Sequence, residues 1–305
     1  MIIYYHPQYN FNLGILGWLH PFDGKKFAKV HKRIAGLEGI TIVHVEQPID
    51  ADVINGFVGE LLRRLLDSKR YILQALEVPY IPLLPFSIID HRILVPMRWA
   101  VAGTLAAART SLTGVNAWNL AGGYHHASKK NAQGFCIYND VGIAVEELLA
   151  ENALSAKDEI LIIDVDAHHG NGNAYVFMEN DKVTILDIYN NDIYPRSDYT
   201  KERVNINIQL RMHTSADEYL SKLKSGLDKI RGGYKVAFVV AGTDVLESDP
   251  LGGLNLSIAD CVARDKLVLD KLHSLSIPAV FLGGGGYGRE SAAAIIGSIS
   301  AHYRM

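Results

Sequence analysis

Three residues of the sequence could hold a metal ion. Asp166 and His168 stand two positions apart at the end of an apolar run, and Asp244 follows another such run. In an extended stretch, residues i and i+2 point the same way, so both side chains can reach one ion. Two carboxylates and one imidazole that leave a position open for water are typical of a catalytic zinc site, and Fe²⁺ or Co²⁺ would also accept these ligands.

Two adjacent histidines, His125 and His126, could move the protons that hydrolysis by a metal-activated water requires. Histidine titrates near neutral pH, so it can take a proton from water and give one to a leaving amine. A carboxylate behind one imidazole would hold its tautomer, and Asp164 is the candidate for that role. An isolated His-His pair in a glycine-rich loop would more often be solvated or simply buried.

Tyr287 follows four consecutive glycines. Such a turn has free backbone angles and no obstructing side chains, so the phenol can reach over the metal and stabilise an oxyanion by hydrogen bonding. A phosphate-binding loop is the alternative for a glycine run. The residues that follow are Tyr-Gly-Arg, however, and not the Lys-Ser/Thr that a nucleotide loop needs.

These residues must be positioned by strands, and the sequence contains short apolar runs that end in Gly, Asp or His. Continuous apolar runs are typical of strands covered on both faces, and residues 203–210 alternate instead, as in a half-exposed strand. The expected strands are residues 117–120, 160–166, 183–189, 203–210, 235–241 and 278–282.

Helical patterns separate these strands. Apolar residues recur three and four positions apart in residues 98–109, 140–151, 216–231 and 257–275, and residues 61–76 are expected to form a core helix. The alternation predicts a parallel sheet with helices on both faces. Active sites in such folds lie beyond the carboxyl ends of the strands, which is where the polar residues above occur.

Composition limits the function classes. The chain has 305 residues and a net charge of -3, which gives no basic excess for direct nucleic-acid binding. The most apolar stretch, residues 71–89, carries three prolines and Glu77, so no membrane span is expected. Two cysteines and the absence of a signal-peptide pattern at the N-terminus predict a cytoplasmic protein.

Together these motifs resemble the histone deacetylase family, in order and spacing, over residues 90–290. The matching segments are residues 121–126 (Ala-Gly-Gly-Tyr-His-His), 134–136 (Gly-Phe-Cys), 163–172 (Ile-Asp-Val-Asp-Ala-His-His-Gly-Asn-Gly), 241–244 (Ala-Gly-Thr-Asp) and 283–287 (Gly-Gly-Gly-Gly-Tyr). Residues 20–23, 189–195 and 251–254 look closest to the class IV branch.

The resemblance implies the arginase-deacetylase fold, an α/β fold with a mostly parallel sheet of about eight strands, as one domain over residues 1–305. By the same resemblance, Asp166, His168 and Asp244 match the ligands of one Zn²⁺. A structural K⁺ is also implied, held partly by backbone carbonyls. Its implied ligands are Asp164, Asp166, His168, Asp187 and Ile188.

The resemblance also implies catalytic roles. His126 matches the general base and then acid, and His125 matches its electrostatic partner, backed by Asp164. Tyr287 matches the tyrosine that polarises the scissile carbonyl. Asn171 stands behind His126, where some members carry Asp. Because an amide stabilises an imidazolium less than a carboxylate does, we expect His126 to be the less basic of the two histidines.

The implied reaction is removal of an acyl group, acetyl or longer, from an amine such as a protein lysine or a small molecule. The acyl channel is implied at Gly134, Phe135, Tyr194 and Leu251. The sequence indicates no oligomeric state.

Two other functions share part of this pattern. A binuclear manganese ureohydrolase would need further Asp residues at the positions of Gly170 and Leu246. A catalytically silent binding module of the same fold would more often have lost Tyr287 or a metal ligand.

Overall fold

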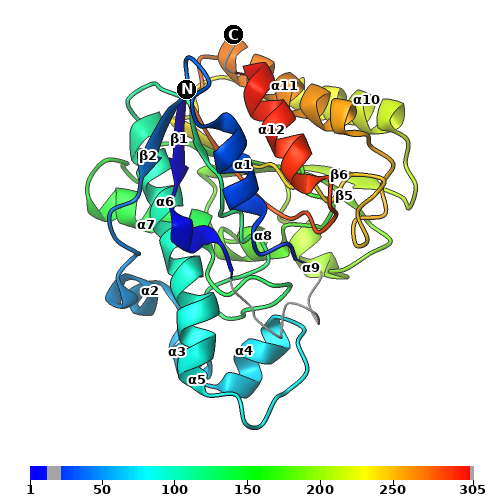
Figure 1. The fold of residues 1–305 in the computed structure, drawn as a ribbon. Coiled ribbons are helices and arrows are strands. Elements are labelled where there is room, and N and C mark those ends of the chain that lie inside the picture. Colours follow the sequence, from blue (N-terminus) through cyan, green and yellow to red (C-terminus); the bar gives the residue numbers. More distant parts are fainter. Residues whose placement is uncertain (12–21, 303–305) are drawn as a thin grey trace.

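The computed structural model describes residues 1–11 and 22–302. Within them eight strands form one sheet, in the order β2-β1-β3-β8-β7-β4-β5-β6, and every neighbouring pair is parallel (Figure 1). The strands are β1 (Ile2–Tyr5), β2 (Thr41–His44), β3 (Ala117–Asn119), β4 (Ile160–Asp164), β5 (Val183–Asn190), β6 (Ile206–Leu210), β7 (Val236–Val240) and β8 (Ala279–Leu282).

Helices cover both faces of the sheet in two groups. One group contains α6, α7 and α8, which pack against one another in that order, and the other contains α1, α12, α11 and α10 (Figure 1). The helices are α1 (Lys26–Ile34), α2 (Ala51–Phe57), α3 (Glu60–Leu66), α4 (Lys69–Ala75), α5 (Phe86–Ile89), α6 (Val95–Ser111), α7 (Asp140–Ala150), α8 (Asn171–Val176), α9 (Asp198–Lys201), α10 (Ala216–Leu227), α11 (Ile258–Ser274) and α12 (Ser291–His302), with a 3-10 turn at Pro7–Tyr9 and a π-helical turn at Asp90–Leu94.

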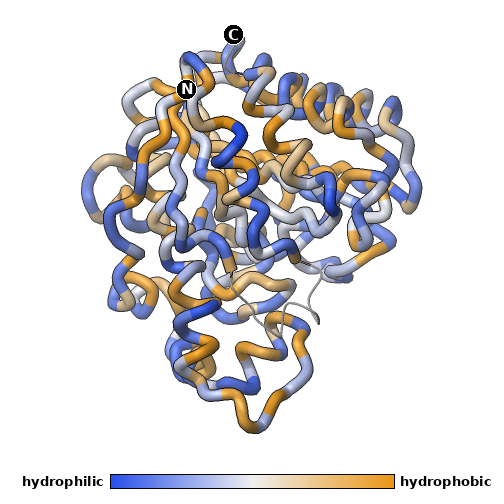
Figure 2. Tube along the Cα trace, viewed as in Figure 1, coloured by the Kyte–Doolittle hydropathy of each residue, from blue (hydrophilic) through white to orange (hydrophobic). Residues whose placement is uncertain are grey.

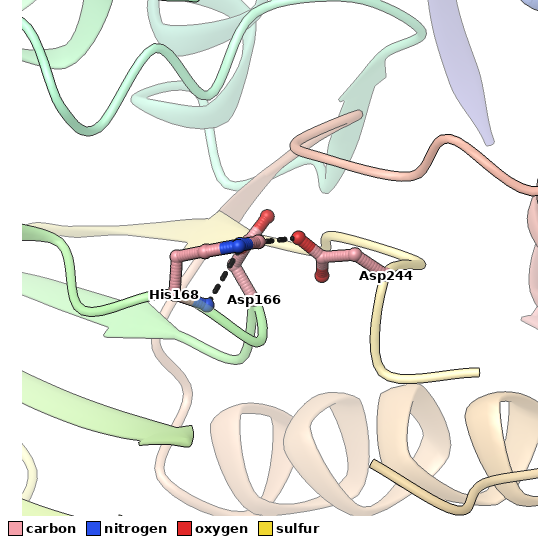
Figure 3. A group of neighbouring side chains, drawn as sticks. All are labelled: Asp166, His168 and Asp244. Atoms are coloured by element: carbon pink, nitrogen blue, oxygen red, sulfur yellow. Dashed lines mark hydrogen bonds and ion pairs between the residues drawn. The ribbon is translucent and has the colours of Figure 1, made fainter. Parts of the chain in front are cut away.

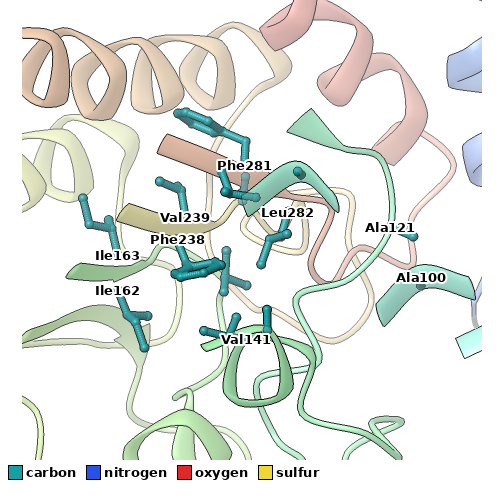
Figure 4. Close-up of a cluster of buried hydrophobic side chains, with 14 of the residues drawn as sticks. Ala100, Ala121, Val141, Ile162, Ile163, Phe238, Val239, Phe281 and Leu282 are labelled. Atoms are coloured by element: carbon teal, nitrogen blue, oxygen red, sulfur yellow. The ribbon is translucent and has the colours of Figure 1, made fainter. Parts of the chain in front are cut away.

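The core lies on both sides of the central strands. Every residue of β4, β7 and β8 is buried, because a parallel sheet covered on two faces offers no solvated side. Phe238 and Val239 are consecutive on β7 and pack on opposite faces, since side chains alternate along a strand. Figure 4 shows this cluster, which includes Ala100 of α6 and Val141 of α7.

The structure confirms the predicted fold class and changes one local prediction. Residues 61–76 form two short helices, α3 and α4, and not one. The break occurs because the Ser68 hydroxyl accepts the N–H of Tyr71 and starts a new helix. Strands β1 and β2 and helix α12 were not predicted. Of the class IV-like segment 20–23, His20 and Pro21 lie outside the described residues.

Hydropathy follows burial over most of the described chain, with apolar segments in the sheet and polar ones on the outer helices (Figure 2). One apolar segment lies at the surface instead, in the loop between α4 and α5. Among the described residues, no helix combines the length and the apolar character needed to cross a bilayer.

Candidate active site

Three buried side chains converge beyond the ends of β4 and β7, which are neighbours in the sheet. Asp166 and His168 come from the loop after β4, and Asp244 comes from the loop after β7 (Figure 3). The Nδ1 atom of His168 lies 2.8 Å from Oδ2 of Asp244 and 3.2 Å from Oδ1 of Asp166. One ligand atom from each residue lies within 4.8 Å of the others, so the predicted metal ligands come together.

Backbone N–H groups hold the two carboxylates in place. Gly285 donates to Oδ2 of Asp166 at 2.8 Å, and Ala167 donates to Oδ1 of Asp244 at 2.9 Å. A Cβ atom on Gly285 would lie 2.5 Å from Oδ2 of Asp244 and 2.7 Å from Oδ2 of Asp166. The glycine is therefore required so that the backbone can approach both carboxylates.

The charges of this cluster fit a cation. Both carboxylates are fully buried, and burial together with the neighbouring Asp166 raises the pKa of Asp244 to about 7. Burial acts to lower the pKa of His168, but hydrogen bonds to Asp166 and Asp244 raise it to about 10. Both shifts reflect an excess of buried negative charge, which a divalent cation at this point would neutralise. The donor set of two carboxylates and one imidazole suits zinc.

The two adjacent histidines lie beside this cluster with different partners. The Nδ1 atom of His125 lies 2.8 Å from Oδ2 of Asp164, and that of His126 lies 2.7 Å from Oδ1 of Asn171. Their ring centroids are 4.1 Å apart. The loop that carries them is fixed by Asp140, whose buried carboxylate accepts the N–H groups of the two preceding residues, Gly123 and Tyr124.

These partners separate the two imidazoles electrostatically. Burial opposes protonation of His125, yet Asp164 and Asp166 raise its pKa to about 9. Burial and the charges of His125 and His168 hold the pKa of His126 well below its usual value. His126 is therefore the neutral imidazole of the pair and can accept a proton. With Asn171 as its partner, His126 was expected to be the less basic histidine, and the pKa shifts have that order.

Tyr287 is held by a carboxylate that the sequence reasoning missed. The N–H groups of Tyr287 and Gly288 donate to Oδ2 of Asp249 at 2.7 and 2.9 Å. The Tyr287 ring packs edge-on against Phe135, with centroids 5.5 Å apart. Burial and the charge of Asp244 raise the pKa of Tyr287 well above its usual value, so the phenol stays protonated and can donate a hydrogen bond.

A buried lysine, Lys26, supports the glycine run that precedes Tyr287. Its Nζ atom lies 3.3 Å from the carbonyl oxygens of both Gly285 and Gly286 and is fully buried. Burial lowers its pKa to about 8, against the attraction of Asp244 and other carboxylates, so the group still carries charge at neutral pH. No local pattern marks Lys26, which is one of several lysines at the start of α1.

A second missed residue, Arg264 of α11, joins the two strand ends that carry the metal cluster. Its Nη1 atom donates to the carbonyl oxygen of Val165 at 3.0 Å and to that of Gly242 at 2.5 Å. Val165 directly precedes Asp166 in the chain, and Gly242 lies two residues before Asp244. Asp265 forms an ion pair with the buried guanidinium at 2.8 Å and compensates its charge.

A second buried acidic pair lies behind the histidines. Asp164 and Asp187 are register partners on β4 and β5. Oδ2 of Asp187 accepts Nδ1–H of His169 at 2.6 Å and the N–H of Gly170 at 3.0 Å, whereas its Oδ1 has no hydrogen-bond partner among the described residues. An unpartnered buried carboxylate oxygen leaves a place for a water molecule or an ion.

A cavity of about 80 Å³ opens beside the histidines and Tyr287. Apolar side chains form most of its lining, which includes Phe11, Phe22, Phe27, Leu73, Leu76, Val78, Ile93 and Met97. Of the predicted channel residues, Gly134 and Phe135 line this cavity. Tyr194 packs edge-on against His126 at 5.1 Å and is 41% exposed, and Leu251 is not among the lining residues.

Phe135 adopts an unusual backbone conformation in the wall of this cavity. Its φ of 63° lies in the left-handed region, which costs free energy for a bulky side chain. The N–H of Phe135 donates to the carbonyl of Ala75 at the end of α4, at 3.0 Å. This bond joins the Phe135 backbone to α4, and the Phe135 ring contacts Tyr287.

Comparison with known proteins agrees with this geometry. A family model of the histone deacetylase domain matches residues 69–302. The chain is 31% identical over 301 residues to histone deacetylase 2 of Arabidopsis thaliana, an alignment that covers 97% of this chain and 77% of that protein.

Two solved structures share the fold. One is an HDAC homologue complexed with SAHA, with a TM-score of 0.76 and 22% identity over 99% of this chain and 83% of the other. The other is an acetylpolyamine aminohydrolase from Burkholderia pseudomallei, with a TM-score of 0.72 and 18% identity over 98% of each chain. With the arginase-deacetylase architecture and a family match over most of its length, the chain belongs to the histone deacetylase family.

Proposed function

We propose that this chain is a zinc-dependent hydrolase that removes an acyl group from an amine, with residues 1–305 as one catalytic domain. The observation that carries the proposal is the convergence of Asp166, His168 and Asp244 beside a neutral His126 and a protonated Tyr287. These are the ligands, base and oxyanion donor that amide hydrolysis requires.

Zn²⁺ bound by Asp166, His168 and Asp244 would polarise the acyl carbonyl and lower the pKa of a water molecule. Fe²⁺ or Co²⁺ would suit the same ligands. The chain's own residues then move the protons. Nε2 of His126 accepts a proton from the attacking water, because its Nδ1 atom faces the amide oxygen of Asn171. The Tyr287 hydroxyl donates a hydrogen bond to the developing oxyanion.

His125 supplies a fixed positive charge beside this step. Asp164 holds its Nδ1–H and keeps the ring oriented. That charge disfavours lasting protonation of His126, so the proton taken from water is passed on to the leaving amine. We further propose that K⁺ binds behind the histidines, supported by the unpartnered Oδ1 of Asp187. Its ligands would come from Asp164, Asp166, His168, Asp187 and Ile188, partly through backbone carbonyls.

The lining of the cavity favours an acyl group longer than acetyl. Its volume of about 80 Å³ is below the range for pockets that hold drug-sized ligands, roughly 300 to 1,000 Å³, so this proposal rests on the apolar lining and not on size. The lining is mostly apolar, and burial of each methylene group would contribute about 0.8 kcal/mol to binding. We therefore favour a class IV-like defatty-acylase. The support is the resemblance of residues 20–23, 189–195 and 251–254 to that branch, together with the apolar lining of this cavity.

The amine carrier has two candidates. A protein lysine is favoured by the similarity to histone deacetylase 2 of Arabidopsis thaliana. A small acylated amine is the second, favoured by the fold shared with the acetylpolyamine aminohydrolase. We expect no direct nucleic-acid binding at a net charge of -3. The buried free thiols of Cys136 and Cys261 support a reducing, cytoplasmic location.

The test is a comparison of initial rates for the zinc-loaded protein on acetyl-lysine and myristoyl-lysine versions of one peptide, with a hydroxamate inhibitor as control. A higher kcat/KM for the myristoyl peptide supports the long-chain assignment. A higher value for the acetyl peptide means a deacetylase and contradicts the chain-length proposal alone. Hydroxamate-insensitive turnover contradicts zinc dependence. Absence of turnover on both peptides and on an acylated polyamine would favour a silent binding module.

A further inference from the structure

The loop between α4 and α5 exposes apolar side chains. Residues 78–85 contain no charged side chain, and three prolines, Pro79, Pro82 and Pro85, divide the loop. Leu83 is 94% exposed and Tyr80 is 44% exposed. Figure 2 shows this loop as an apolar tip at the lower end of the molecule, below α4 and α5 of Figure 1. Contiguous exposed apolar patches mark interaction sites, and this uncharged loop places two exposed apolar side chains close together in the sequence.

The loop is held in one shape. Nζ of Lys69 donates to the carbonyl oxygens of Pro82 at 2.6 Å and Leu84 at 3.0 Å, and the N–H of Leu84 donates to Ile81 at 3.2 Å. Ile81 and Leu84 pack against the core. The three prolines have no backbone N–H group, so at these positions there is no donor that would be removed from water on insertion. Several backbone polar groups of the tip are thus satisfied or absent, which reduces the cost of moving it into an apolar phase.

Two basic side chains from the start of α4 lie against Tyr80 of the loop. Nζ of Lys69 lies 5.0 Å from the Tyr80 ring centroid, and Cζ of Arg70 lies 4.4 Å from it. Residues 69–86 carry these two cations and one acidic residue, Glu77, so the segment is +1 (2 − 1), whereas the whole chain is -3. Leu83 forms an aliphatic tip, and Tyr80 with the two cations lies next to it. This order fits the boundary between acyl chains and anionic headgroups.

We propose that residues 79–85 dock the protein on anionic lipid surfaces, with Leu83 inserted among the acyl chains and Lys69 and Arg70 at the headgroups. A lipid surface fits this tip better than a protein groove does, because the loop is convex and is flanked by cations. The contact is peripheral and reversible, since one leucine and one tyrosine bury little apolar area.

The position of the loop joins this surface to the cavity. Leu73 and Leu76 of α4 and Val78 at the start of the loop line the cavity, and Ala75 accepts the N–H of Phe135. One segment therefore faces the cavity on its inner side and the proposed lipid surface on its outer side. This consequence rests on the proposed function: an amine with a long acyl chain, which partitions into membranes, would meet the enzyme at the bilayer surface.

The experiment is vesicle flotation of the full chain with phosphatidylcholine vesicles that contain about a fifth phosphatidylserine. We expect the wild type to float, and Leu83→Ser to bind about tenfold more weakly because it loses one inserted leucine. Leu61→Ser is the matched control, since Leu61 is 70% exposed on α3 outside the loop. Arg70→Gln should weaken binding to these vesicles and not to pure phosphatidylcholine.

Two results would overturn the proposal: a wild type that stays in the aqueous fraction, or a Leu83→Ser protein that floats as the wild type does. If the wild type does not bind vesicles but self-associates through Leu83 in light scattering, the tip is a protein contact. That result would also overturn the lipid proposal. Hydrolysis of a water-soluble acyl-lysine peptide is measured in parallel and should be equal in Leu83→Ser and wild type, because Leu83 does not line the cavity. Flotation without hydrolysis would contradict the proposed function and leave the lipid contact standing.

Discussion

The Nδ1 atom of His126 lies 2.7 Å from the side-chain oxygen of Asn171. An amide oxygen only accepts hydrogen bonds, so Nδ1 of His126 carries the hydrogen and its Nε2 atom keeps the lone pair. His125, by contrast, faces the carboxylate of Asp164 at 2.8 Å. The neighbouring histidines thus differ in charge. Burial and the charges of His125 and His168 lower the pKa of His126, and the amide behind it offsets this less than the acid behind His125 does.

Replacing that amide by an acid should change the pH dependence. In Asn171→Asp, a carboxylate would stabilise the protonated form of His126 and raise its pKa. A base acts only when deprotonated, so the acidic limb of the kcat/KM profile should move to higher pH by the same amount. The pH profile of hydrolysis measures the shift, and an unchanged acidic limb would exclude His126 as the base. Asn173→Asp, on the same helix, is the control.

Tyr287→Phe separates oxyanion stabilisation from packing. The phenylalanine keeps the edge-on contact with Phe135 and loses only the hydroxyl. We expect zinc content to stay at the wild-type level and the barrier to rise by roughly 2 to 4 kcal/mol, because one oxyanion donor is removed. Zinc analysis together with kcat on the preferred acyl peptide tests this. Turnover at the wild-type rate would show that Tyr287 does not act on the oxyanion.

Asp244→Asn should lower the affinity for the metal without lowering the stability of the metal-free protein. Asparagine can still accept the N–H of Ala167 but carries no charge, so zinc affinity and activity should fall together. The pKa of Asp244 is about 7 in the folded protein, above its ordinary value of 3.8. Between these two pH values the folded state binds more protons than the unfolded state, so the protein loses stability as the pH rises from 3.8 to about 7. At pH 7 the metal-free variant should therefore unfold at no lower temperature than metal-free wild type. Full zinc retention would contradict the ligand assignment.

The predicted elements are those with a strong local signal. Strands β4, β5, β7 and β8 are apolar runs, and the rule that parallel strands end at a common edge correctly predicts that their polar ends lie together. Strands β1 and β2 were missed because neither is a continuous aliphatic run: β1 ends in two tyrosines, and β2 is bounded by Thr41 and His44 and is only partly buried. Helix α12 was missed because its small residues give little amphipathic contrast.

Residues that act through backbone atoms could not be predicted in this way. Asp249 accepts backbone N–H groups, whereas Lys26 and Arg264 donate to backbone carbonyls. Any residue type supplies those backbone groups, so no partner motif appears in the sequence. Lys26 is also 260 positions from Gly286. Its role depends on the packing of α1 beside the glycine run, which local patterns do not encode.

Lys26→Met should impair catalysis without removing the metal ligands. Methionine fills a similar volume but donates no hydrogen bonds, so the carbonyl oxygens of Gly285 and Gly286 lose their partner and the loop that orients Tyr287 loosens. We expect kcat to fall by about tenfold or more, with zinc content near the wild-type level. Lys25→Met is the control, because Lys25 is exposed on the preceding position. Equal losses in both variants would show that Lys26 has no specific role.

Arg264→Met tests whether the two strand ends are held together by one guanidinium. The variant leaves the buried carboxylate of Asp265 without its cation and frees the carbonyls of Val165 and Gly242. Breaking a buried pair in this way typically costs about 3 to 5 kcal/mol. Chemical denaturation of the zinc-free protein measures the loss apart from metal binding. Arg231→Met, which removes an exposed ion pair with Glu159, should leave stability nearly unchanged. If Arg264→Met proved as stable as that control, the buried arginine would not be what holds the ends of β4 and β7 in register.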